Sequence, residues 1–271
     1  MAEILAGGCR VSDMCEGEPL TEGTLRIWNR IGRANGAQAI SLRIMEFAPG
    51  LSPGIQNEEC DEILYAINLS LAMDTNRNEV SSARVSGWIN LLIDGRTYQL
   101  LHDTGIYIRP GETFAIDNPG PDPIVLISSQ CPDPDRLPNF VAPITSLAPD
   151  SSSPQQRRTV RLSDRAPQST ADRWYRVLVD DEVGSTQVTQ FVGSIPPGRA
   201  PDHFHNYEEV LFILKGQGRM WAGETNTSIA PGSCIYLPEG QVHCVENTGA
   251  GELRLLGVFY PAGSPSVRYD V

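Results

Sequence analysis

The chain has 271 residues, of which 40% are hydrophobic and 20% are charged, a composition typical of a soluble globular protein. Its length allows one large domain or two domains of ordinary size. The formal net charge of −12 opposes binding to nucleic acid or to an anionic membrane surface, so neither is expected as a partner.

The N-terminal residues, MAEILAGGCRVSDM, lack the basic segment and the apolar run of a secretory signal. The chain also lacks a stretch of about 18 consecutive apolar residues, the length that a transmembrane helix needs. We therefore expect a cytoplasmic protein. The cysteines are scattered without a CxxC pair and are predicted to be free thiols. They are Cys9, Cys15, Cys60, Cys131, Cys234 and Cys244.

The first half of the chain is predicted to consist of short strands. A strand ends at EFAPG (46–50), a short loop follows, and the next strand lies in QNEECDEILYAI (56–67). A polar stretch around Ser70–Arg84 predicts a surface loop. The block GIYIRPGETFAIDN (105–118) comes next. These β-rich runs are bounded by Gly and Pro and show no sustained helical period, which favours strands.

Residues 132–170 are predicted to be a linker. They include PDPDRLP, APDSSSPQQRR and SDRAPQS, in which Pro, Ser, Asp and Arg dominate. Such a segment is not expected in a hydrophobic core, although part of it can lie over a domain.

The second half repeats the plan of the first. SIPPG (194–198), HFHNYEEVLFIL (203–214) and SCIYLPEGQVHCVEN (233–247) align with the three blocks of the first half. Each half therefore predicts a compact all-β barrel or double-sheet jelly roll. The predicted organisation is a barrel over 1–131, the linker, and a second barrel over 171–271.

Three of the four histidines of the chain fall in the second half, at the start of two predicted strands. His203 and His205 are two residues apart, so they share one face of a strand, and Glu209 keeps the same parity. His243 follows the turn LPEGQ on a strand that must pass beside the first one for the barrel to close. This pattern predicts one metal site. The alternative is a set of polar residues that holds no ion.

The two segments that carry these residues resemble a known family. GRAPDHFHNYEEVLFILKG (198–216) resembles the first motif of the cupin superfamily, with its first gap one residue shorter than usual. GSCIYLPEGQVHCVEN (232–247) resembles the second cupin motif at every spacing. Two such barrels in tandem resemble the bicupins. The resemblance implies four metal ligands, which are His203, His205, Glu209 and His243.

The N-terminal copy departs from the pattern. Gln56 and Glu58 stand in place of the two histidines, Glu62 is kept, and Phe114 stands in place of the last histidine. Gln and two carboxylates could hold a hard cation. Phe114, however, cannot ligate and would fill the site. We expect this barrel to be free of metal and to serve in dimer contact, as a lid or in stability.

Imidazole ligands suit zinc, copper, iron and nickel, and a carboxylate widens the choice towards manganese and iron. We expect one divalent ion per chain, Fe(II) or Mn, with Zn or Ni as alternatives. An octahedral ion with four protein ligands keeps two positions for a small-molecule substrate, or for substrate and dioxygen. Arg219, Trp221 and Tyr236 are candidates for lining the pocket.

The resemblance implies several functions, because bicupins include dioxygenases, decarboxylases and isomerases. The first hypothesis is a dioxygenase-type enzyme that uses Fe(II) or Mn on a small oxygen-rich metabolite. The alternatives are a metal-dependent isomerase or lyase, a non-enzymatic cupin that binds a small ligand, and a scaffold with both sites empty. An unpaired edge strand favours a homodimer, unless the two halves of one chain cover each other's edges.

Overall fold

The structure is a computed structural model that describes residues 1–67, 89–147, 157–170, 172–266 and 269–270. The loop predicted around Ser70–Arg84 lies outside these residues. Strands dominate the described residues, where helical structure is confined to short 3-10 turns. The predicted all-β class is confirmed. No described helix has the length and apolar character needed to span a membrane. The turns are η1 (Ala6–Gly8), η2 (Arg33–Asn35), η3 (Leu162–Asp164) and η4 (Asp181–Val183).

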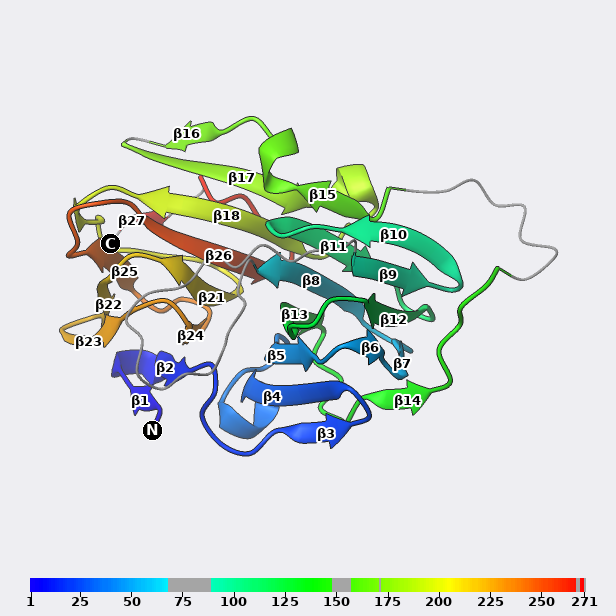
Figure 1. The fold of residues 1–271 in the computed structure, drawn as a ribbon. Helices are drawn as coiled ribbons and strands as arrows, with labels where there is room; N and C mark the ends of the chain where they lie inside the picture. Colours follow the sequence, from blue (N-terminus) through cyan, green and yellow to red (C-terminus); the bar gives the residue numbers. More distant parts are fainter. Residues whose placement is uncertain (68–88, 148–156, 171, 267–268, 271) are drawn as a thin grey trace.

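Most of the first half folds into two antiparallel sheets (Figure 1). The larger sheet has the strand order β15-β11-β8-β13-β5-β4-β3, and the smaller has the order β10-β9-β12-β7-β14, with β6 beside β12. Apolar side chains from both sheets form one buried cluster. The strands are β3 (Leu20–Glu22), β4 (Leu25–Ile31), β5 (Leu42–Phe47), β6 (Gly50–Leu51), β7 (Gly54–Gln56), β8 (Asp61–Ile67), β9 (Ile89–Ile93), β10 (Arg96–Leu100), β11 (Thr104–Ile108), β12 (Thr113–Asn118), β13 (Ile124–Cys131), β14 (Asn139–Val141) and β15 (Thr159–Arg161).

The second half has the same two-sheet plan. Its larger sheet has the order β1-β2-β24-β21-β26-β18-β17-β16, and its smaller sheet has the order β23-β22-β25-β20-β27, with β19 beside β25. The strands are β1 (Glu3–Ile4), β2 (Arg10–Asp13), β16 (Gln168–Thr170), β17 (Arg173–Val179), β18 (Thr189–Ile195), β19 (Gly198–Arg199), β20 (His203–Phe204), β21 (Glu208–Lys215), β22 (Gly218–Ala222), β23 (Thr225–Ile229), β24 (Ser233–Leu237), β25 (His243–Asn247), β26 (Leu253–Tyr260) and β27 (Tyr269–Asp270).

The internal repeat seen in the sequence is a structural repeat. Gly50 pairs with Asn118 in the first half, and Gly198 pairs with Asn247 in the second. Each asparagine donates from its side chain to two backbone carbonyls, one at the end of a strand of the larger sheet and one in the turn that follows the asparagine. The predicted jelly-roll fold is thus confirmed, with each half built from two separate sheets rather than one closed barrel.

The two halves share a hydrophobic core. The largest cluster of buried side chains draws on the larger sheets of both halves, for example Tyr65 and Val125 from one and Val210 and Phe212 from the other. The N-terminal strand β2 also crosses over and pairs with β24, so it covers an edge of the other half's sheet (Figure 1). The division at residue 131 stays a prediction, and residues 3–13 extend the sheet of the C-terminal half.

The segment predicted as a linker adds strands to both halves. β14 pairs with β7 and β15 with β11 in the first half, whereas β16 pairs with β17 in the second. Val160 and Leu162 are buried in the shared core, so the expectation that this segment stays outside a core is wrong for its described C-terminal part. These two apolar residues lie among many polar ones, so the average composition of the segment did not indicate that they are buried.

Candidate metal centre

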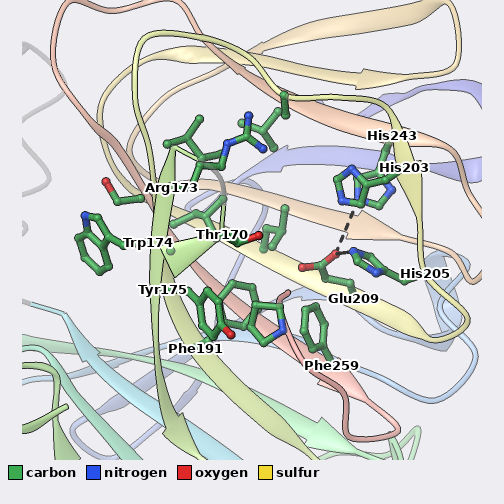
Figure 2. Close-up of a pocket in the computed structure, with 18 residues that line it drawn as sticks. Thr170, Arg173, Trp174, Tyr175, Phe191, His203, His205, Glu209, His243 and Phe259 are labelled. Atoms are coloured by element: carbon green, nitrogen blue, oxygen red, sulfur yellow. Dashed lines mark ion pairs between the residues drawn. The ribbon is translucent and has the colours of Figure 1, made fainter. Parts of the chain in front are cut away.

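Backbone pairing brings the predicted ligands together at one end of the second half's interior. His203 on β20 is directly opposite His243 on β25, and His205 follows two residues later. One donor atom from each of these histidines lies within 4.8 Å of the others. Glu209 is not part of this group of three, but its carboxylate approaches two of the rings from β21 in the facing sheet. Figure 2 shows the three imidazoles and the Glu209 carboxylate turned towards one another.

Backbone carbonyls determine the tautomer of two of these histidines. Nδ1 of His203 lies 3.0 Å from the carbonyl oxygen of Pro201, and Nδ1 of His243 lies 2.8 Å from that of Gln241. A carbonyl oxygen only accepts, so Nδ1 must carry the proton and donate in both rings. In a neutral imidazole this leaves Nε2 with a lone pair, the tautomer that a metal-binding histidine needs.

The fourth side chain, Glu209, is buried beside two of these rings. Its Oε2 atom is 3.7 Å from Nε2 of His205 and 3.8 Å from Nε2 of His243. Burial raises the pKa of the Glu209 carboxyl to about 8. Burial, followed by the nearby His203, lowers the pKa of His243 to about 3. Both side chains therefore stay uncharged at neutral pH until a cation compensates the carboxylate.

These donors fit a divalent metal ion. Two ligand atoms at about 2.1 Å from one ion are separated by about 3–4 Å, which agrees with the spacing of Glu209 Oε2 from the two imidazole nitrogens. Within the described residues, the salt-bridge partners of Glu209 are these two histidines, and His243 is uncharged at neutral pH, so an ionised Glu209 would need a cation beside it. Three imidazoles and one carboxylate suit iron, manganese, zinc or nickel.

A cavity of about 120 Å³ opens beside the four side chains, and its walls are mainly apolar. Phe191 and Phe259 form one wall, with ring centroids 4.9 Å apart. The ring of Tyr207 is stacked on that of His205, at a centroid distance of 4.8 Å, which restrains the imidazole. Apart from the proposed ligands, the titratable side chains of the lining are Arg173 and Tyr175.

The residues that line the cavity differ from those expected. Arg219, Trp221 and Tyr236 are not part of the lining, so this expectation is wrong. Trp221 donates to Glu246 instead, and Tyr236 donates to Glu208. The aromatic wall was missed because it joins strands β18 and β26, whose contact no local pattern reveals. Side chains alternate between the two faces of a strand, and this rule places Phe191 and Phe259 on the same face as Glu209. The alternation could therefore have indicated the aromatic wall.

The four corresponding residues of the first half do not form a second centre. Gln56 and Glu58 both accept from the side chain of Asn139, at 2.9 Å each. Glu62 accepts from Arg43 Nη2 at 2.7 Å. Phe114 is fully buried in the apolar core of that half. An arginine thus supplies the positive charge beside the carboxylate that corresponds to Glu209.

Comparison with known proteins identifies a domain in the second half of the chain. Residues 191–259, which contain all four side chains, match the family described as Cupin domain. Auxin-binding protein T92 of Nicotiana tabacum is 33% identical over 87 residues, which are 28% of this chain and 46% of that protein. Auxin-binding protein 1 of Arabidopsis thaliana is 32% identical over 83 residues, or 27% of this chain and 42% of that protein. The chain thus spans less than half the length of these curated relatives.

The fold as a whole is similar to that of oxalate decarboxylase from Bacillus subtilis. A single-residue variant of that enzyme aligns with a TM-score of 0.73 and 14% identity, over 96% of this chain and 79% of the other. Another structure of the enzyme, from work on its Mn(II) centres, aligns equally well, with the same score, identity and coverage. At this identity the likeness concerns the fold, and it extends over both halves. Residues 191–259 thus match a cupin domain, and the fold of the whole chain is similar to that of a bicupin.

Proposed function

We propose that the chain is a metal-dependent oxygenase that acts on a small molecule with chelating oxygen atoms. One divalent ion per chain, Fe(II) or Mn, would be held by the second half, with Zn or Ni as alternatives. The ligands in this proposal are His203, His205, Glu209 and His243. The observation that carries it is the chemistry of the cavity, which combines these donors with walls that offer almost no other reactive group.

An ion in this site would act as a Lewis acid and, in the case of Fe(II), would bind dioxygen beside the substrate. The protein's own contribution is geometry and exclusion of water. The carbonyls of Pro201 and Gln241 orient two imidazoles, and the stacked ring of Tyr207 restrains a third. The wall of Phe191 and Phe259 lowers the local dielectric and strengthens every charge interaction inside.

The side chains that line the cavity also limit which kinds of substrate can bind. An apolar wall favours a substrate with an apolar body, whereas its chelating oxygens would face the four polar donors. Arg173 is the cation of the lining, so it is suited to a negatively charged group of the substrate. The predicted oxygen-rich metabolite is thereby narrowed to a compact molecule with an apolar body and one chelating, acidic end.

Oxygen uptake tests this proposal. The metal-depleted chain, reloaded with Fe(II) or Mn(II) under argon, would be mixed with aerated catechols, 1,3-diketones or 2-oxo acids, and dioxygen would be followed with an electrode. We expect uptake that depends on the added metal and on at least one substrate class, and that is lost in Glu209→Ala. If a chain loaded with one ion consumes no dioxygen with any of these chelators, the oxygenase proposal is wrong.

A lyase is the second candidate, and the likeness of the fold to oxalate decarboxylase favours it. Arg173 suits a carboxylate substrate in this case as well. Release of carbon dioxide from a 2-oxo acid or a dicarboxylate without net dioxygen uptake would select the lyase. Stoichiometric binding of a small acid with neither reaction would instead select a non-enzymatic cupin, a class favoured by the similarity to proteins named for auxin binding.

A further inference from the structure

The first half contains a polar cavity at the end of its larger sheet, on the same face as Glu62. Its volume is about 300 Å³, compared with about 120 Å³ beside the candidate metal centre. Ser41, which directly precedes β5, and Arg43 of β5 line it together with Gln130 of β13. The rest of the lining consists of Asn29, residues 31–35, Asp133 and residues 135–137. None of the functions considered above uses this cavity.

The repeat explains why this cavity differs from its counterpart. Ser128 pairs with Arg43, as Gly257 pairs with Phe191 in the second half. Gln130 pairs with Glu62, as Phe259 pairs with Glu209. The aromatic wall of the second half is therefore replaced by a guanidinium, a hydroxyl and an amide. Both halves contain the buried carboxylate. The interior beside it is polar in the first half and apolar in the second.

Arg43 is the central group of this cavity. Its side chain is 4% exposed, and Nη2 donates to Glu62 Oε1 at 2.7 Å and to Ser128 Oγ at 3.0 Å. Neither Nη1 nor Nε donates to any residue in the part of the chain that the structure describes. A buried guanidinium that uses one of its three nitrogens keeps donor capacity for a further acceptor. Because Arg43 lines the cavity, that acceptor can come from a ligand.

The rim of the cavity adds positively and negatively charged side chains. Arg33 makes no ion pair with the described residues, and Arg136 pairs with Glu58. Asp133 accepts from the backbone N–H groups of Arg33 and Asp135, so both of its oxygens are used. The Asp135 carboxylate accepts no hydrogen bond from a described residue. The cavity therefore offers guanidinium groups for an anion and a carboxylate for hydroxyl donors.

We propose that this cavity is a second, metal-free binding site, which takes a small hydroxylated carboxylate of the sugar-acid class. The carboxylate of the ligand binds Arg43 and Arg33, and its hydroxyls donate to Asp135 and bond to Asn29 at the mouth. A guanidinium matches the two oxygens of a carboxylate in geometry and charge. A purely apolar acid would make no hydrogen bond to Asp135 or Asn29, so it is expected to bind less tightly than a hydroxylated one.

Calorimetric titration with gluconate tests the site, and sorbitol serves as the matched neutral ligand. The full-length chain with His243→Ala would be used, which disables the candidate metal centre and separates this proposal from the proposed function. We expect one gluconate per chain and affinity for sorbitol at least about tenfold weaker. The proposal is overturned if gluconate and sorbitol bind alike, or if gluconate shows no binding at about 10 mM.

Variants of the cavity localise the binding. Arg43→Met alone would leave Glu62 buried and unpaired, so it is combined with Glu62→Gln, which removes both charges. We expect this pair to weaken gluconate binding at least about tenfold, Arg33→Ala to weaken it less, and Arg157→Ala, at an exposed position outside the cavity, to leave it unchanged. Unchanged binding in a folded double variant contradicts the site. If that variant does not fold, a crystal soaked in gluconate decides, because ligand density away from Arg43 overturns the proposal.

Discussion

The protonation of Glu209 couples metal binding to pH. The metal-free carboxyl has a pKa raised to about 8 by burial, so an ion must displace a proton below that pH. His243, with a pKa lowered to about 3, is already neutral and releases none. The stability of the metal-free fold changes with pH in the opposite direction to the metal affinity. The contribution of Glu209 to the metal-free fold is fully present below its unfolded pKa near 4.5 and is lost as the pH rises through about 8.

We therefore predict that the affinity for Mn(II) rises with pH by about tenfold per unit between pH 6.5 and 8 and levels off above that range. Competition with a chelator of known affinity measures it, and a pH indicator counts the proton released. In Glu209→Gln the affinity should be lower and the slope shallower over the same range. An equal slope in both proteins would show that another group carries the proton.

Gly257 makes room for the aromatic wall of the cavity. A Cβ atom at this position would overlap the ring of Phe191, whereas one at Gly193 would meet its nearest neighbours at 3.4 and 3.5 Å. We predict that Gly257→Ala destabilises the protein by about 1–3 kcal/mol, because the ring must move within a packed wall. Gly193→Ala on the neighbouring strand is the control and should cost clearly less. Guanidinium denaturation measures both, and equal losses would contradict this role for Gly257.

The residue types and motif spacings of the four candidate ligands could be predicted from the sequence. The expectation that His203, His205 and Glu209 share one face of a single strand is wrong, because β20 ends at Phe204 and Glu209 lies on β21 of the facing sheet. The pairing of His203 with His243 agrees with the neighbouring strands expected from barrel closure. Phe191 and Arg173 could not be predicted, because their place in the lining depends on how β17 and β18 pack. The absence of metal from the first half, expected from Phe114, stays a prediction. The ion pair between Arg43 and Glu62 could not be predicted, because it depends on the packing of β5 and β8 on either side of β13.

At the scale of elements, strand β21 links the candidate metal centre to the other half of the chain. Glu209 faces inward, and its neighbour Glu208 faces the first half, as alternation requires. The Glu208 carboxylate accepts from the backbone N–H groups of Gln38 at 2.7 Å and Ala39 at 2.6 Å, and also from the hydroxyl of Tyr236. One buried carboxylate thus joins a loop of the first half to the strand that carries a proposed ligand.

We predict that Glu208→Gln destabilises the full chain by roughly 2–4 kcal/mol, because an amide cannot accept all three hydrogen bonds with both of its terminal atoms. The melting temperature should fall by at least about 5 °C. Glu224→Gln, at an exposed position on the β22–β23 turn, is the matched control and should leave it unchanged. If both variants melt alike, the contact between Glu208 and the first half contributes nothing to stability.

The strands of each half were predictable, whereas the exchange of elements between halves was not. Apolar alternation and the Gly and Pro boundaries mark strands such as β8 and β21 locally. The pairing of β2 with β24 joins segments more than two hundred residues apart, and no periodicity in either segment indicates its partner. The general need to cover a sheet edge was foreseeable, and here a strand of the same chain meets it.

At the scale of the whole molecule, the chain combines two versions of one fold with different interiors. The second half gathers three imidazoles and a carboxylate beside an apolar cavity. The first half holds the corresponding carboxylate in an ion pair beside a polar cavity. Because the larger sheets share one core, neither half is expected to be stable alone. The two interiors therefore belong to one folded unit, and we expect metal in the second interior alone.

Elemental analysis of the full chain, purified without chelators and then dialysed against a metal mixture, tests this assignment most directly. We predict about one divalent ion per chain, retained in His102→Ala, which removes an exposed histidine outside the site, and in Phe114→Leu in the first half. His243→Ala should lose most of it. Less than about 0.2 ion per chain in the parent protein, or equal retention in His243→Ala and His102→Ala, would contradict the account.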